Sequence, residues 1–94
     1  MAIYIPISLD SRAGERLIYV YSQPILASDP VKPKRFKVVG ENRGSVLYDG
    51  ESGQFTQLSG ADWDDRQFFF KRVCVALKKR LEKGEIPERA EYAA

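Results

Sequence analysis

The first part of the chain alternates apolar and polar positions. Every second residue from Ile3 to Leu9 is apolar, and this period of two predicts a half-buried strand. Pro6 cannot donate to a strand ladder, so we expect this strand to lie at a sheet edge or to carry a bulge. A polar turn around Gly14 leads to a second predicted strand, residues 17–21, which is apolar on both faces. The two strands could form a hairpin with a loop longer than the tight two-residue type.

The middle of the chain is broken by prolines and glycines. Residues 23–34 hold three prolines, and we interpret this segment as an irregular connection that is extended around each X-Pro step. A turn is expected at 41–44, and another at 49–53, where Asp-Gly and Ser-Gly are strong turn signals. Three further short strands are predicted, at residues 35–39, 45–48 and 54–58.

After residue 58 the apolar period changes to 3.6 residues, which predicts one long helix over residues 62–83. Gly84 and Pro87 mark its end. Acidic residues fill its first turn and basic residues its last turns, as the helix dipole favours. Residues 88–94 are expected to form a flexible tail. One face of the helix should pack on the sheet, and it carries Trp63, Phe70, Val73, Cys74, Leu77 and Leu81.

These elements predict a single α+β domain spanning residues 1–94. The sheet-forming region is 1–58, and the sheet is antiparallel with four or five strands. The long C-terminal helix packs on one face of it. The pattern leaves the order of the strands open.

Composition agrees with a small globular protein. Of 94 residues, 44% are hydrophobic and 30% are charged, which is ordinary for a folded domain. No apolar run approaches the roughly 20 residues that a bilayer-spanning helix needs, and the first nine residues do not resemble a signal peptide. The lone Cys74 allows no internal disulfide. We therefore expect a soluble cytoplasmic protein.

The chemistry needed for catalysis is sparse. The chain has no histidine and one cysteine, which removes the commonest general base and the usual zinc ligand sets. No phosphate-binding glycine loop is present. The acidic cluster Asp62, Asp64 and Asp65 could hold a hard cation, but we interpret it as helix capping because neighbouring helical positions diverge. The sequence favours a protein that is not an enzyme and has no cofactor and no metal.

Two apolar residues fall outside the core stripe of the helix. Phe68 and Val75 share a face turned about 150° from that stripe at 100° per residue, and Arg72 and Lys79 supply a polar rim. One interpretation is that the Pro-rich segment 24–33 folds over this face. The other is that a second chain covers it, which makes the four residues a candidate protein interface.

The net charge of +2 conceals a segmented pattern. Residues 31–43 carry five basic groups and one acidic group, and residues 44–65 carry five acidic groups and no basic group. A basic sheet with aromatic residues could bind nucleic acid. The candidate contacts are Lys32, Lys34, Arg35, Lys37 and Arg43.

Two functions remain from this sequence. The first is a non-catalytic protein-binding module, such as a small cytoplasmic inhibitor or immunity-type protein that blocks a larger partner. Its partner is unidentified, and a homodimer is one form it could take. The alternative is a nucleic-acid-binding sheet domain that uses the basic segment 32–43.

Overall fold

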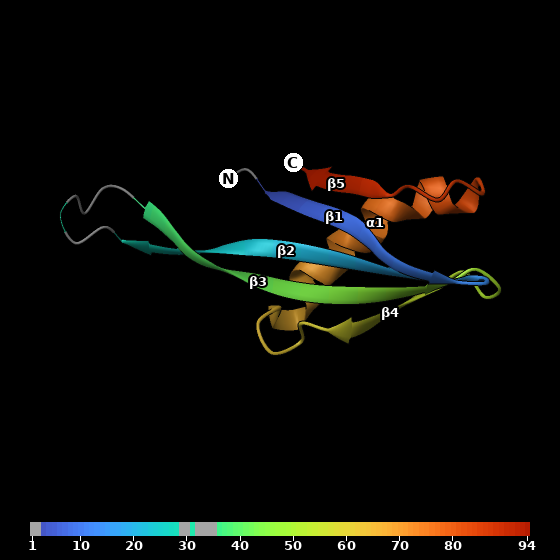
Figure 1. The fold of residues 1–94 in the computed structure, drawn as a ribbon, viewed down its shortest axis with the longest axis horizontal. Helices are drawn as coiled ribbons and strands as arrows, with labels where there is room; N and C mark the ends of the chain where they lie inside the picture. Colours follow the sequence, from blue (N-terminus) through green and yellow to red (C-terminus); the bar gives the residue numbers. More distant parts are fainter. Residues whose placement is uncertain (1–2, 29–30, 32–35) are drawn as a thin grey trace.

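The computed structural model describes residues 3–28, 31 and 36–94. They form a five-stranded antiparallel sheet in the order β4-β3-β2-β1-β5, with one helix against one face (Figure 1). The predicted α+β class, antiparallel sheet and C-terminal helix are confirmed. The elements are β1 (Tyr4–Ala13), β2 (Arg16–Ser28), β3 (Phe36–Asp49), β4 (Gln54–Ser59), a 3-10 turn (Asp65–Gln67), α1 (Phe68–Glu82) and β5 (Arg89–Ala93).

The core lies between α1 and the sheet. Phe70, Val73, Leu77 and Leu81 of α1 are buried, as their helical spacing predicts. They meet alternate residues of the three central strands, which point to the helix side. These strand residues are Ile5, Ile7, Leu17, Tyr19, Tyr21, Val46 and Tyr48.

The helix begins later than the sequence predicts. The expected start was residue 62, but the α-helix begins at Phe68 after a 3-10 turn. Arg66 and Gln67 have positive φ angles of 54° and 58°, and this left-handed backbone interrupts a continuous helix. Trp63 therefore precedes the helix, and its ring packs between those of Tyr21 and Phe69, each with centroids 5.6 Å away.

The C-terminal residues were expected to form a flexible tail, and this prediction is wrong. Arg89–Ala93 forms β5, which pairs antiparallel with β1. Ala90 and Tyr92 alternate toward the core and are half-buried. Two inward side chains are too short a pattern to identify a strand by themselves, and the partner strand lies more than 80 residues earlier.

The predicted interruptions in the middle of the chain are also wrong. Residues 23–28 continue β2 through Pro24, and β3 runs without a break through the expected turn at 41–44. Pro24 is compatible with the ladder because β2 has only β3 as a neighbour at this point, and proline is tolerated at a strand edge. The remainder of the Pro-rich segment lies outside the described residues, apart from Val31.

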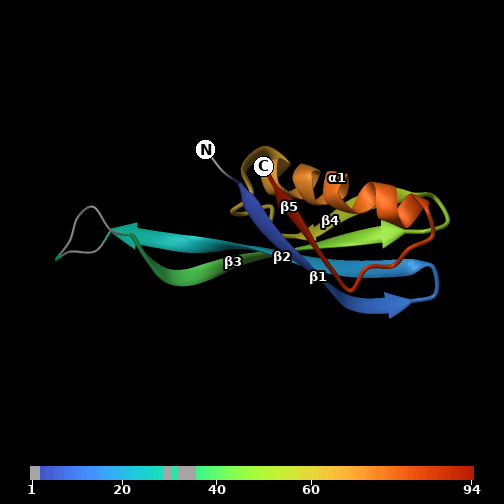
Figure 2. The same ribbon diagram turned by 90° about the horizontal axis from the view of Figure 1, so that it is seen from above.

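The position of Pro6 explains where β2 separates from β1. The backbone amides of Ile3 and Leu9 donate to carbonyls on the β5 side, so alternation directs the nitrogen of Pro6 toward β2. Pairing between β1 and β2 stops at Ile7 and Tyr21. Beyond this point β2 and β3 continue together as a two-stranded ribbon that projects from the body (Figures 1 and 2). We call residues 22–28 and 36–44 the arm, and residues 3–21 and 45–94 the body.

Candidate protein-docking face

In the described part of the chain, the sheet face opposite α1 carries no helix (Figure 2). On β2 and β3 this face consists of six cross-strand pairs, because Tyr19 and Tyr21 point to the core and their neighbours point away. We call these six pairs the open face. From body to arm they are Ile18–Leu47, Val20–Ser45, Ser22–Arg43, Pro24–Glu41, Leu26–Val38 and Ser28–Phe36.

The arm end of the open face is apolar and exposed. Leu26, Val38 and Phe36 keep 55%, 62% and 68% of their accessible surface. The reverse face of the arm is apolar too, since Ile25 and Val39 are also exposed. A two-stranded ribbon with neither face covered is marginally stable by itself, and an apolar cluster of this kind marks an interaction surface.

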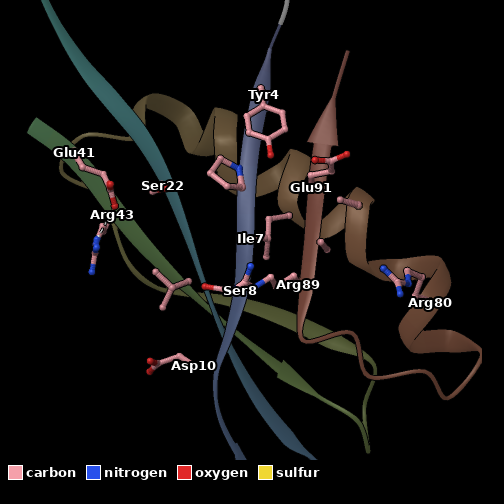
Figure 3. Close-up of a pocket in the computed structure, with 14 residues that line it drawn as sticks. Tyr4, Ile7, Ser8, Asp10, Ser22, Glu41, Arg43, Arg80, Arg89 and Glu91 are labelled. Carbon is pink, nitrogen blue, oxygen red and sulfur yellow. Dashed lines mark hydrogen bonds and ion pairs between the residues drawn. The ribbon is translucent and has the colours of Figure 1, made fainter. Parts of the chain in front are cut away.

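The centre of the open face is charged and hollow. A hollow of about 860 Å³ lies along β1, β2, β3 and β5 and reaches α1 at Ala76 and Arg80, and its lining includes Ser22, Glu41 and Arg43 (Figure 3). Arg43 Nε lies 2.7 Å from Glu41 Oε1, and the two side chains are 73% and 47% exposed. Such an exposed ion pair contributes little to stability. Its charges remain accessible to a partner that approaches this face.

The border of the hollow near β5 holds a second polar contact. The Glu91 carboxylate beside the Tyr4 hydroxyl raises the pKa of that hydroxyl above its ordinary value, mainly through their hydrogen bond. Both groups come from outside β2 and β3, on β5 and β1. The hollow therefore has polar groups both on its β5 side and on its arm side, where Ser22, Glu41 and Arg43 line it.

The base of the arm is fixed by close contacts with the body. A Cβ atom on Gly44 would lie 2.4 Å from the Tyr21 ring, so only glycine fits there. The Trp63 indole donates a hydrogen bond of 2.9 Å to the Arg43 carbonyl. These contacts position Arg43 at the boundary between body and arm. Gly44 in a strand was the sequence signal for such a close approach.

The helix residues predicted as a protein interface do not form a broad apolar surface. The Arg72 guanidinium lies 3.6 Å from the centre of the Phe68 ring, and its Nη1 donates to the Phe68 carbonyl. Phe68 is 39% exposed and Val75 66%, and Lys79 is exposed. Residues 24–28 belong to the arm, which points away from α1 (Figure 2).

The basic residues predicted to contact nucleic acid are only partly described. Lys32, Lys34 and Arg35 lie outside the described residues. Lys37 and Arg43 pair with Ala27 and Ser22, which are an odd number of positions apart on β2 and so face opposite sides. The structure does not bring these two cations together.

The acidic cluster serves the fold. The buried Asp64 carboxylate accepts hydrogen bonds from the amides of Phe69 and Phe70, while Asp62 and Asp65 are exposed. Within the described ranges, no group of three or more acidic or thiol side chains is arranged to hold a metal ion. No helix in that same part of the chain is long and apolar enough to cross a bilayer.

Comparison with known proteins adds no assignment. The interpretation of the open face therefore depends on its own residues. No family model, curated protein or solved structure matches the chain.

Proposed function

We propose that this chain is a non-catalytic protein-binding module that docks through its open face, with the arm as the main contact. The observation that carries this proposal is the exposure of Leu26, Val38 and Phe36 on a ribbon that leaves the body. Burying one such side chain against a partner contributes about 1.5–3 kcal/mol. Apolar clusters with a polar border are typical of the centres of protein interfaces.

The chemistry of the arm favours a protein partner over nucleic acid. Interfaces with nucleic acid are strongly basic, because cations must neutralise phosphates. The described arm has three charged residues, Lys37, Glu41 and Arg43, and Glu41 already pairs with Arg43. A phosphate backbone would gain little from this surface and would leave its apolar side chains exposed.

A small module with one apolar docking face and no recognisable catalytic site is suited to block or recruit a larger protein. This is the class of a stoichiometric inhibitor or immunity-type protein. The arm is the better candidate for the contact than the helix surface around Phe68. The Phe68 ring is already stacked against Arg72, whereas the arm side chains form a continuous row.

Site-specific photo-crosslinking in the native cell tests the proposal. A photoreactive residue replaces Val38 in one variant and Val75 in another, both exposed in the free chain. We expect discrete protein adducts from position 38 and none from position 75. Adducts from 75 alone would transfer the interface to the helix, and adducts with nucleic acid from position 38 would contradict a protein-binding role.

A further inference from the structure

The open face has apolar side chains toward both ends and one charge of each sign at its middle. Its two end pairs, Ile18–Leu47 and Ser28–Phe36, are apolar or mixed, and the next pairs inward each carry an aliphatic side chain, Val20 or Leu26 with Val38. The two central pairs contain Arg43 and Glu41, one charge of each sign. In either direction, two pairs with at least one apolar side chain lead to a central charged pair, and the two central charges have opposite signs.

We propose that the open face docks onto the open face of a second copy of this chain, antiparallel and related by a two-fold axis at its middle. This inference rests on the proposed docking function and names its partner. The apolar arm of each copy then covers the body end of the other. Leu26 faces Val20 of the second copy, and Phe36 faces Leu47. Sheets packed in this way lie about 10 Å apart.

The charges select this arrangement. In the antiparallel stacking, Arg43 of each copy faces Glu41 of the other, and the contact occurs twice because the interface is isologous. A parallel stacking sets each pair on the identical pair of the second copy, so Arg43 faces Ser22 and the opposite charges no longer meet. The apolar arms would then cover each other, and the two body ends would do the same. The two stackings therefore differ in their charge contacts, and only the antiparallel one brings opposite charges together.

A second copy also covers both the arm end and the body end of the open face in one contact. Among the described residues, no element covers the open face of the arm, and α1 lies on the other face of the sheet at the body end. One antiparallel contact covers the two regions in both copies. A partner with a different sequence would have to supply an apolar surface at each end and opposite charges at the correct spacing.

Charge exchange tests the inference. Glu41→Arg and Arg43→Glu are made as separate variants, and both sites are exposed, so each variant should fold. We expect the wild type to dimerise as its concentration rises in sedimentation velocity. Each single variant sets like charges across the axis and should dimerise about tenfold or more weakly. An equimolar mixture of the two variants should recover the dimer, because every contact is again between opposite charges.

Matched substitutions locate the interface. Val38→Asp should abolish the dimer, and Val75→Asp should leave it unchanged. A wild type that stays monomeric from micromolar to millimolar concentration overturns the inference. So does a dimer that survives Val38→Asp, or a variant mixture that stays monomeric. If the chain is monomeric while position 38 crosslinks to another protein, the docking function stands and the second copy is wrong as its partner.

Discussion

The strands β2 and β3 run through both the body and the arm, and their side chains are buried to different extents in the two regions. In the body, Tyr19, Tyr21 and Val46 are fully buried beneath α1. In the arm, Leu26 and Val38 continue the same two strands with more than half of their surface exposed. A helix of 15 residues is about 22 Å long, which is enough to cover the body but not the arm. Apolar residues on one face of a strand indicate that this face is buried by packing. They do not indicate whether the same chain or another chain packs on it.

The largest expected difference between the two regions is in packing energy. Leu77→Ala removes a fully buried side chain of α1 and should cost about 2–5 kcal/mol of unfolding free energy, since the sheet cannot close the cavity. Urea denaturation measures this loss. Val75→Ala, on the exposed side of the same helix, is the control and should be nearly neutral. An unchanged midpoint for Leu77→Ala would contradict the assigned core.

The next expected effect concerns the connection between the start of α1 and the sheet. The Asp64 carboxylate accepts hydrogen bonds from the Tyr21 hydroxyl, the Gln57 amide and the backbone amides of Phe69 and Phe70. Asp64→Ala leaves these donors unsatisfied and should cost about 2–3 kcal/mol. Thermal unfolding measures the change, and the exposed Asp65→Ala is the matched control. Equal melting temperatures for the two variants would show that the network does not hold the helix start.

Thiol reactivity compares body and arm directly. Burial raises the pKa of the Cys74 thiol to about 11, so little reactive thiolate is present at neutral pH. We expect slow labelling of the native protein by a maleimide. Val38→Cys in a Cys74→Ala background should react much faster, because position 38 is exposed when the chain is dilute and monomeric. Equal labelling rates at positions 74 and 38 would contradict the difference in side-chain exposure between the body and the arm.

The smallest expected effect is on the stability of the arm itself. Val38→Thr keeps the β-branched shape and changes a side chain that is solvated in the single chain. At low protein concentration the free energy of unfolding should change by less than about 0.5 kcal/mol. Denaturation at two concentrations checks this, because a cost that appears only at high concentration indicates that the arm is buried by association. A large cost at high dilution would mean that the arm packs on its own body.

Much of the candidate face was beyond sequence reasoning for identifiable reasons. The sequence singled out the segment that contains the arm, but through its lysines, because charge runs are visible along a chain. Leu26 was assigned to an irregular connection because of the prolines around it, and Val38 to a short strand at 35–39, so neither was identified as part of an exposed face. The pattern of the open face depends on the pairing of β2 with β3, in which Leu26 meets Val38 and Pro24 meets Glu41. Pairing between residues that lie 8 to 29 positions apart cannot be inferred from either segment alone.

The sequence by itself determined the elements whose signal is local. The alternation in residues 3–9 and the 3.6-residue period around Val73 and Leu77 identify a strand and a helix with their buried faces, because side-chain direction follows directly from backbone geometry. Only the tertiary structure decided the rest. It ordered the last residues as β5 against β1, and it extended β2 through Pro24 where no neighbouring strand needs the missing amide. It also left the arm uncovered by any other described element, because the helix begins at the base of the arm and runs away from it over the body.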